Sequence, residues 1–337
     1  MTHSEIEEIK ELIASRKSIV IVTHKNPDGD AMGSSLGLYN YLVRKNHKVN
    51  VITPNGCPLF LQWLPGDDKV IEFSESAGRA EALIKKADVI FCLDFNALRR
   101  IGDLGALVKK SKAVKILIDH HLQPEKFADY MMCDKKSCST AQLVFDFIAV
   151  LGDKRLINRK AANCLYVGIM TDSLNFKIST TSAHTHRVAA ELIDAGAQNN
   201  LAYSNVYDTN SEDRLRLLGH CLGKEMKVLN EYNASFIALS KSDLKKFNFR
   251  KGDTEGFVNY PLSIEGIKFS ALFMEMKDEI KISFRSKGNF DVNKFARKHF
   301  RGGGHANAAG GEAQGSLDDA VLKFVNLLAE YKEELLK

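Results

Sequence analysis

Thr-His-Lys-Asn-Pro-Asp-Gly-Asp-Ala-Met-Gly-Ser, at residues 23–34, directly follows the apolar run Ser-Ile-Val-Ile-Val at residues 18–22. An apolar run of this kind predicts a buried strand, so His24, Asp28 and Asp30 are expected on a tight loop where that strand ends. Unpaired carboxylates are costly to bury in a protein core. Three potential ligands so close together therefore indicate a divalent metal ion.

The same arrangement recurs at later points of the chain. One apolar run ends at Asp94, and the next ends at Asp119-His120-His121. Asp172 follows an apolar helical stretch and is a further candidate. Three predicted strands thus each deliver an acid or an imidazole at the carboxyl end.

Together these positions supply four carboxylates and two imidazoles as potential metal ligands: His24, Asp28, Asp30, Asp94, His120 and Asp172. Oxygen and imidazole donors without a thiolate favour Mn²⁺, with Mg²⁺, Co²⁺ or Zn²⁺ as alternatives. One ion rarely takes so many side chains, whereas two ions roughly 3.5–4 Å apart and bridged by one carboxylate would use them all. Such a pair clamps a phosphoryl group and activates a water molecule for in-line attack on phosphorus.

The order of the predicted elements in the first half is that of an α/β protein. Strands are expected near residues 18–23, 48–53, 88–93 and 114–118, and helices near 4–15, 33–45, 78–86, 139–151, 159–170 and 183–195. This alternation predicts a doubly wound, mostly parallel sheet, in which ligands bind beyond the carboxyl ends of the strands. The candidate metal ligands stand at those ends. At the start of the chain, Ser4 and Glu7 resemble a capping box.

The remainder of the chain reads as a smaller α+β domain. Strands are expected near 234–239, 267–273 and 279–284, and helices near 291–299 and 317–336. A polar stretch without a strong apolar period separates the two parts, although a helix could begin near Glu212. We therefore expect a metal-binding catalytic domain at 1–195, a linker at 196–215 and a substrate-binding domain at 216–337.

Composition is that of an ordinary globular protein, with 45% hydrophobic and 26% charged residues. No apolar run approaches the length of a membrane span, and the N-terminus lacks a signal-peptide pattern, so we expect a cytoplasmic protein without membrane partners. The six cysteines form no C-x-x-C pair, which predicts reduced thiols and no zinc ribbon. An apolar surface on the first domain could pair two chains into a homodimer.

A basic, glycine-rich segment in the second part is a candidate anion site. Residues 281–305 contain seven Lys and Arg and one Asp, a charge that faces either an anion or only solvent. Consecutive glycines at 302–304 would let backbone N–H groups form a phosphate nest, although a flexible turn is the alternative. Substrate contacts are expected from five residues of this segment: Arg285, Ser286, Gly303, Gly304 and His305. This grip would face the metals across a cleft between the domains, a geometry that favours short single-stranded substrates.

These motifs resemble a known family. Asp119-His120-His121 is similar to the triplet that names the DHH phosphoesterases, and Gly302-Gly303-Gly304-His305 resembles the signature of the DHHA1 domain. The two-domain layout is most similar to the bacterial nanoRNase group. That resemblance implies hydrolysis of very short oligoribonucleotides and dephosphorylation of 3′-phosphoadenosine 5′-phosphate (pAp).

The resemblance also implies roles for single residues. His24, Asp28 and Asp94 would hold one Mn²⁺, and the second would be held by Asp30, Asp94, His120 and Asp172, with Asp94 as the bridge. The catalytic residues would be Asp94, Asp119 and His121. Asp119 would orient the triplet, and His121 would contact the scissile phosphate. Arg301 stands where the group often has glycine, which adds positive charge and could alter substrate preference.

Other functions are compatible with parts of this pattern. A phosphodiesterase for pApA or a cyclic dinucleotide would use the same chemistry. An inorganic pyrophosphatase shares a similar metal domain but is disfavoured by the glycine-rich loop, and a RecJ-like DNA exonuclease is disfavoured because such chains are longer. A non-enzymatic RNA-binding module would not need so complete a ligand set.

Overall fold

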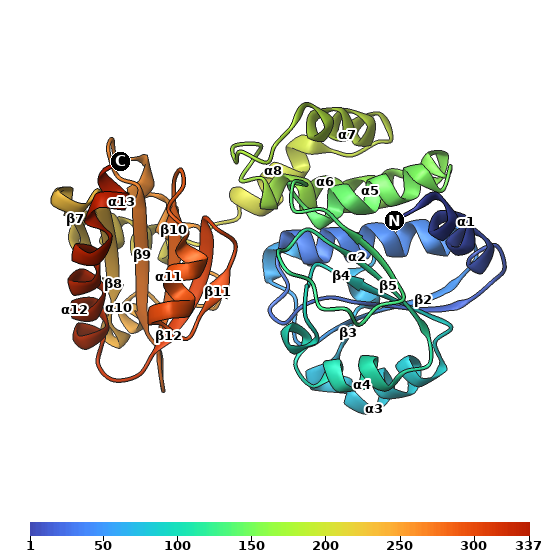
Figure 1. Ribbon diagram of the computed structural model, residues 1–337, viewed down its shortest axis with the longest axis horizontal. Coiled ribbons are helices and arrows are strands. Elements are labelled where there is room, and N and C mark those ends of the chain that lie inside the picture. Colours follow the sequence, from blue (N-terminus) through green and yellow to red (C-terminus); the bar gives the residue numbers. More distant parts are fainter. The chain divides into compact units, whose positions relative to one another are not determined.

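The computed structural model describes residues 1–337, which divide into two compact units, Met1–Thr209 and Asn210–Lys337 (Figure 1). The first unit contains α1 (His3–Leu12), β1 (Ser18–Val22), α2 (Gly29–Arg44), β2 (Lys48–Thr53), β3 (Ile71–Glu72), α3 (Phe73–Lys86), β4 (Val89–Leu93), α4 (Leu104–Lys110), β5 (Val114–Asp119), β6 (Tyr130–Cys133), α5 (Thr140–Val150), α6 (Arg159–Asp172), α7 (Ala183–Asp194) and α8 (Asn199–Tyr207).

The sheet of the first unit is parallel throughout, with the strand order β3-β2-β1-β4-β5-β6. Helices α2, α5 and α6 cover one face, and α3 and α4 cover the other (Figure 1). Apolar side chains of each strand alternate between these two faces, so that Ile19 and Ile21 belong to one core and Val20 and Val22 to the other. The predicted doubly wound fold is confirmed.

Helices α2 and α6 approach each other closely because glycines line their contact. Gly33 lies so near α6 that a Cβ atom there would stand 2.6 Å from the Cys164 carbonyl oxygen and 2.7 Å from the Gly168 nitrogen. A Cβ on Gly37 would run into Leu165 in the same way. Since α2 carries Asp30 near its start and α6 ends at Asp172, this close packing brings two candidate ligands together.

The second unit contains α9 (Glu212–His220), β7 (Met226–Leu229), β8 (Ala234–Leu239), α10 (Lys241–Lys246), β9 (Phe269–Glu275), β10 (Ile280–Ser286), α11 (Val292–His299), β11 (Gly303–Gly304), β12 (Ala308–Ala313), α12 (Leu317–Leu328) and α13 (Lys332–Leu336). Its sheet has the order β11-β12-β10-β9-β8-β7 and is antiparallel except for the β8–β9 pair. A phenylalanine-rich core lies against α11 and α12, and a second core contains Leu217 of α9 and Leu244 of α10.

Several details differ from the sequence-based expectations. The capping box at the N-terminus is formed by Thr2 and Glu5, whereas Ser4 lies inside the helix. The expected linker 196–215 contains α8, which packs against α6, and the start of α9 at Glu212. The short strands β3 and β6 were missed because neither has a long apolar run.

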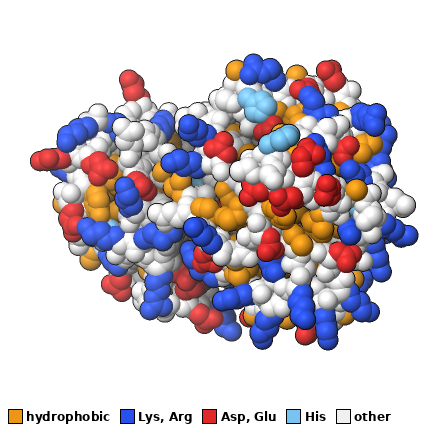
Figure 2. All heavy atoms as spheres, turned by 45° about the vertical axis from the view of Figure 1, so that its right-hand side comes forward, with side chains coloured by type: hydrophobic (Ala, Val, Ile, Leu, Met, Phe, Trp, Pro, Cys, Tyr) orange, Lys and Arg blue, Asp and Glu red, His pale blue; other side chains and the backbone are white.

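No helix of the structure combines the length and the apolar character needed to cross a membrane. All cysteines are free thiols, as expected. Basic and acidic side chains are interspersed over the face shown in Figure 2, and acidic side chains gather on the part of that face formed by the first unit.

Candidate metal centre

The candidate ligands gather at the carboxyl ends of β1 and β4, the two strands between which the strand order of the sheet reverses. Strands β1 and β4 are neighbours in the sheet, but the strand order runs one way from β1 and the other way from β4. Connections leave these two strands toward opposite faces, which opens a crevice at their carboxyl ends. His24 follows β1 and Asp94 follows β4, so both side chains stand at this crevice.

One group of ligand atoms consists of His24, Asp28 and Asp94, which lie within 4.8 Å of one another. The Nε2 atom of His24 is 3.3 Å from Asp94 Oδ2 and 3.8 Å from Asp28 Oδ1. Asp28 is also the N-cap of α2, where its Oδ1 accepts hydrogen bonds from the amides of Asp30 and Ala31. The carboxylate of Asp28 can therefore cap α2 and also lie among the candidate ligands.

The other group consists of Asp30, His120 and Asp172. The Nε2 atom of His120 is 3.4 Å from Asp172 Oδ2, 3.9 Å from Asp30 Oδ2 and 3.6 Å from Asp94 Oδ1. Asp94 thus lies between the two groups, with Oδ2 facing His24 and Oδ1 facing His120. Neither Asp30 nor Asp172 is on a loop, since they occupy the first turn of α2 and the last turn of α6.

Histidine ring orientations are fixed by the backbone. His24 Nδ1 is 3.0 Å from the carbonyl oxygen of Lys25, and His120 Nδ1 is 3.2 Å from that of Ser137. A carbonyl oxygen only accepts, so Nδ1 carries the proton in both rings and Nε2 is directed at the carboxylates. This is the tautomer that a metal-binding histidine needs.

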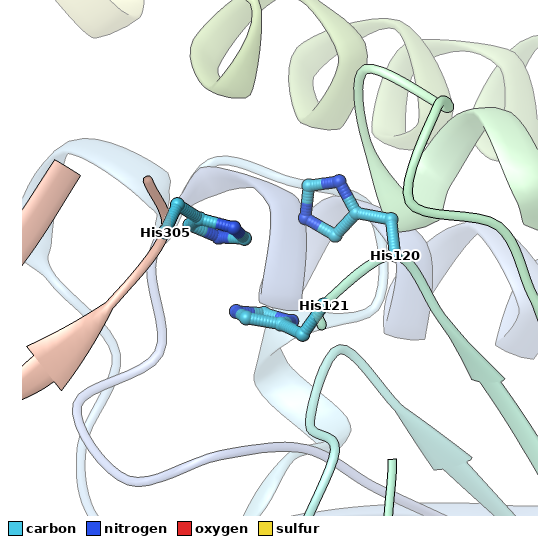
Figure 3. A group of neighbouring side chains, drawn as sticks. All are labelled: His120, His121 and His305. Atoms are coloured by element: carbon cyan, nitrogen blue, oxygen red, sulfur yellow. The ribbon is translucent and has the colours of Figure 1, made fainter. Parts of the chain in front are cut away.

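His121 is held by Asp119 rather than by the backbone. Its Nδ1 atom donates to Asp119 Oδ1 over 2.7 Å, and both side chains are buried. The rings of His120 and His121 meet edge to face at the end of β5, with centroids 5.0 Å apart (Figure 3). The Asp119–His121 hydrogen bond places the donated proton on Nδ1 of His121 and fixes the orientation of the ring.

The electrostatics of the centre are those of crowded carboxylates. Burial and the charges of Asp94, Asp172 and Asp28 raise the pKa of Asp30 well above its usual range. Burial would also raise the pKa of Asp94, but the hydrogen bond with His24 and the nearby imidazoles lower it well below its usual range. For His24, the hydrogen bond to Asp94 and the charge of Asp28 outweigh burial and raise the pKa to about 8.

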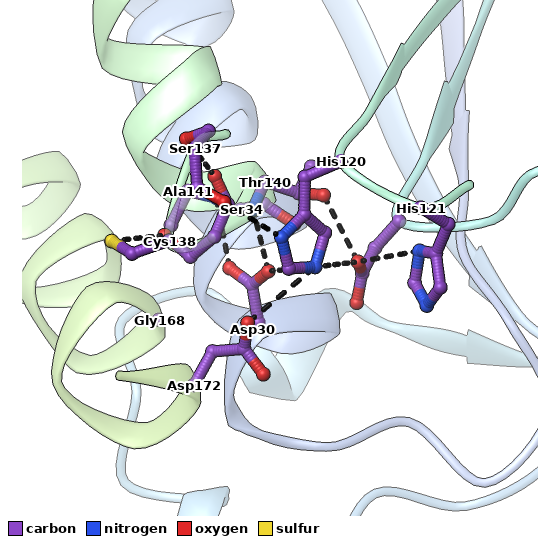
Figure 4. Close-up of polar contacts among 12 residues, drawn as sticks. Asp30, Ser34, His120, His121, Ser137, Cys138, Thr140, Ala141, Gly168 and Asp172 are labelled. Atoms are coloured by element: carbon purple, nitrogen blue, oxygen red, sulfur yellow. Dashed lines mark hydrogen bonds and ion pairs between the residues drawn. The ribbon is translucent and has the colours of Figure 1, made fainter. Parts of the chain in front are cut away.

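Sequence reasoning missed a set of donors behind these ligands. The backbone N–H groups of Thr140 and Ala141, at the start of α5, donate to the two oxygens of Asp30 over 2.6 and 2.8 Å (Figure 4). The Thr140 hydroxyl donates to Asp94 Oδ1 over 2.9 Å. The only signal in the sequence is Ser139, a helix N-cap residue, which points to α5 but not to what its amides bind.

The backbone of Asp94 is itself unusual, with a φ of 64° in the left-handed region. Aspartate tolerates this region better than most residues, but the conformation still carries strain. Its amide donates to the carbonyl oxygen of Ile118, which ties the residue to the end of β5. The strained backbone directs the carboxylate between the two ligand groups.

The residues present suit divalent cations. Carboxylates and imidazoles converge in two groups, and the cysteine thiols Cys133 and Cys138 belong to neither group. Burial and the charges of neighbouring carboxylates raise the pKa of Asp30, and bound cations would offset the repulsion between those carboxylates. Oxygen-rich donor sets of this kind fit Mn²⁺ or Mg²⁺ better than a thiol-seeking metal.

In the second unit, the glycine-rich segment is an edge hairpin rather than a loop. Gly304 has a φ of 152°, and a Cβ atom there would stand 2.7 Å from the Cα atom of Ala309. Its amide donates to the side chain of Asn293, and that of His305 donates to the Ala308 carbonyl oxygen. The glycines therefore serve close backbone packing, and these two N–H groups do not form the expected phosphate nest.

Side chains near this hairpin are arranged in different ways. The Ser286 hydroxyl donates to the Phe290 carbonyl oxygen and accepts from Asn307, so it is engaged within the unit. Arg285 is half-buried on β10 and donates to the Phe284 carbonyl oxygen. His305 lies on the turn between β11 and β12.

A further histidine–carboxylate group lies near the start of the second unit. His220 Nε2 is 2.9 Å from Asp243 Oδ1 and 3.4 Å from Glu225 Oε1. The other oxygen of Asp243 accepts from the backbone of Ser240 in the capping box of α10. Helix capping accounts for this arrangement without a bound ion.

Known proteins resemble this chain over its whole length. Residues 18–169 match the DHH family, N-terminal domain, and residues 229–334 match the DHHA1 domain. The "Bifunctional oligoribonuclease and PAP phosphatase NrnA" of Thermus thermophilus is 30% identical, with 94% of this chain and 90% of the relative covered. The "Cyclic-di-AMP phosphodiesterase GdpP" of Bacillus subtilis is 26% identical and covers 96% of this chain, which spans 49% of that relative.

Solved structures also resemble this chain over most of its length. An exopolyphosphatase-related protein from Bacteroides fragilis has a TM-score of 0.97 and 42% identity, with 100% of this chain and 98% of that chain covered. An exonuclease RecJ bound to manganese has a TM-score of 0.52 at 14% identity, covering 96% and 94%, which is a likeness of fold alone. With both family domains matched in the expected order, the chain belongs to the DHH–DHHA1 family of phosphoester hydrolases.

Proposed function

We propose that this protein is a Mn²⁺-dependent phosphoesterase that hydrolyses short oligoribonucleotides and pAp. The observation that carries the proposal is the position of Asp94, whose two oxygens face two separate groups of ligands. A carboxylate so placed suits a pair of cations rather than one. The relative named as an oligoribonuclease and pAp phosphatase supports this substrate class.

The chain's own residues would divide the work as follows. His24, Asp28 and Asp94 would hold one ion, and Asp30, Asp94, His120 and Asp172 the other. Bound there, the two cations would neutralise phosphoryl charge and make water a stronger nucleophile. His121, oriented by Asp119, would donate a hydrogen bond from Nε2 to the phosphate as negative charge develops.

The second unit would supply the substrate grip. Arg285 and His305 are the side chains that we propose to contact a terminal phosphate or the adjoining nucleotide. Gly303 and Gly304 would act through the tight hairpin that carries His305, whereas Ser286 would act by fixing the turn that follows β10. Catalysis would belong to the first unit and recognition to the second. This division of roles is consistent with a short substrate.

The test is a Mn²⁺-dependent hydrolysis panel of wild type and Asp94→Ala. Its substrates are 5′-phosphorylated RNA of two to five nucleotides, pAp, pApA, cyclic di-AMP, pyrophosphate and long single-stranded DNA. We expect turnover of the short RNAs and of pAp, and its loss in Asp94→Ala, because both ions would lose a ligand. No metal-dependent turnover of the short RNAs or pAp would contradict the proposal.

A second candidate is a phosphodiesterase for pApA or a cyclic dinucleotide. The likeness to a cyclic-di-AMP phosphodiesterase over nearly the whole chain favours it specifically. The metal centre would do the same chemistry, so the difference lies in recognition. Preference for pApA or cyclic di-AMP in the panel would select this candidate.

A further inference from the structure

Thr140 is not itself a candidate ligand, yet it donates hydrogen bonds to two of them. Its amide donates to Asp30 Oδ2 over 2.6 Å, and its hydroxyl donates to Asp94 Oδ1 over 2.9 Å. The residue is fully buried at the start of α5, on neither of the elements that carry those carboxylates. It therefore links the first turn of α2, represented by Asp30 in Figure 4, to the residue that follows β4.

The start of α5 has donors available for this purpose. The first amides of a helix have no partner within the helix, and the helix dipole favours a negative charge beside them. The N-cap Ser139 accepts from Gln142, which leaves the amides of Thr140 and Ala141 for Asp30. Each oxygen of Asp30 receives one N–H group.

These hydrogen bonds do not compete with metal binding. A carboxylate oxygen can accept at two positions, so one donor leaves the other position for a cation. The Thr140 hydroxyl has a single proton, and Asp94 as a carboxylate can only accept it. The direction of each bond is thereby fixed, and each carboxylate keeps its remaining lone pairs for a cation.

We propose that Thr140 is a positioning residue that holds Asp30 and Asp94 at a fixed separation and so sets the affinity of the centre for its cations. This inference rests on the proposed metal centre but not on any particular substrate. Partners behind metal ligands typically contribute 10- to 100-fold to metal affinity. Thr140 would do so for a ligand of each group.

The test compares variants that separate the hydroxyl from the rest of the residue. Thr140→Val removes the O–H donor and keeps the branched shape and the amide, whereas Thr140→Ser keeps the donor. Thr53→Val is the matched control, because Thr53 is a fully buried threonine at the end of β2 whose hydroxyl has no hydrogen-bond partner. Mn²⁺ binding to the metal-free full chain would be measured by titration calorimetry, without substrate.

We expect Thr140→Val to bind Mn²⁺ roughly 10- to 100-fold more weakly than wild type, and Thr140→Ser and Thr53→Val to bind nearly as wild type does. A structural role alone would lower the melting temperature of the metal-free protein and leave the affinity unchanged. Unchanged affinity in folded Thr140→Val would overturn the inference. If that variant does not fold, Thr140→Ala would be judged by the same criterion.

The inference and the proposed function fail in different ways. A wild type that binds Mn²⁺ but hydrolyses nothing in the panel removes the proposed function and leaves the role of Thr140 testable by calorimetry. A wild type that hydrolyses short RNA, together with a Thr140→Val variant of unchanged affinity, removes only the inference. A wild type that binds no Mn²⁺ overturns both.

Discussion

At the scale of single residues, the Asp119–His121 pair separates orientation from metal binding. Asp119 is fully buried, its Oδ1 accepts from His121 over 2.7 Å, and its Oδ2 has no hydrogen-bond partner. An oxygen of a buried carboxylate that lacks a hydrogen-bond partner costs free energy of folding. The contact of the other oxygen is the one that fixes the ring of His121.

Asp119→Asn should lower the turnover of short RNA by roughly 10- to 100-fold while leaving Mn²⁺ affinity within a few-fold of wild type. The amide keeps the shape of the side chain but loses the charge that favours a proton on His121 Nδ1. Single-turnover kinetics and calorimetry would measure the two effects. Asp146→Asn is the control, because Asp146 contacts His184 over a similar 2.8 Å away from the centre and should leave turnover unchanged.

At the scale of elements, the position of Asp30 depends on how α2 lies against α6. Glycines 29, 33 and 37 recur every four residues along α2 and leave no room for side chains at that contact. Asp153 adds a polar connection to the same helix, since its Oδ2 accepts from both Tyr41 and Lys45 over 2.6 Å. The helix is thus held at its start by packing and at its end by an ion pair.

Gly33→Ala should lower the free energy of unfolding by roughly 1–3 kcal/mol, because the new methyl group would press on the backbone of α6. It should also weaken Mn²⁺ binding by separating Asp30 from Asp172. Gly78→Ala in α3 is the control: nothing lies within 4 Å of its added Cβ, so the substitution should stabilise the protein by about 0.5–1 kcal/mol. Urea denaturation measures the free energy of unfolding of both variants. Equal changes in that free energy at the two sites would contradict the packing argument.

The Asp153 contacts should make stability depend on pH. Burial alone would raise the pKa of Asp153, but hydrogen bonds from Lys45 and Tyr41 lower it below the usual 3.8. A carboxyl whose pKa is lowered by folding stabilises the protein above its unfolded pKa, and this contribution is lost as the pH falls through the folded value. Asp153→Asn should therefore cost roughly 1–2 kcal/mol at pH 7. The difference from wild type should shrink as the pH falls below 3.8 and through the lower folded-state pKa. A difference of equal size at pH 7 and in acid would argue against the ion pair.

At the scale of the whole molecule, each unit has its own sheet and its own apolar cores. The two proposed groups of metal ligands belong entirely to the first unit. Cations that bind only the folded first unit should therefore stabilise that unit selectively.

Calorimetric melting should accordingly show two transitions, of which one moves with metal. Mn²⁺ at about 100 times its dissociation constant should add about 2.7 kcal/mol to the stability of the first unit. EDTA should reverse this shift and abolish activity, and renewed Mn²⁺ should restore both. A metal-induced shift confined to the other transition would contradict the location of the centre.

The parallel sheet of the first unit could be predicted because strands buried on both faces leave a continuous apolar run in the sequence. The end of an apolar run such as 89–93 marks the carboxyl end of the strand, and Asp94 is the residue that follows it. The expected linker was less accurate, because α8 stabilises itself by packing against α6 and its sequence alone has no strong apolar period.

The contacts that hold the ligands could not be predicted in the same way. Thr140 is 110 residues from Asp30 in the sequence, and its partners depend on how α5 is placed over the sheet. The hydrogen-bond partners of the glycine-rich segment could not be predicted for a related reason. Consecutive glycines suit an anion site and a tight hairpin equally well, and the amides of Gly304 and His305 are occupied by Asn293 and by the Ala308 carbonyl oxygen, partners that the sequence does not reveal.

The strand order has a consequence for biosynthesis. The proposed ligands extend from His24 to Asp172, and the strand that follows Asp28 in the chain lies on the far side of β1 from β4. A chain growing on the ribosome can complete neither the Asp94 side of the centre before β4 has emerged nor the Asp172 side before α6 has. The full set of ligands therefore exists only once the chain through Asp172, about half of its length, has emerged, and truncated products ending before α6 would lack a complete centre.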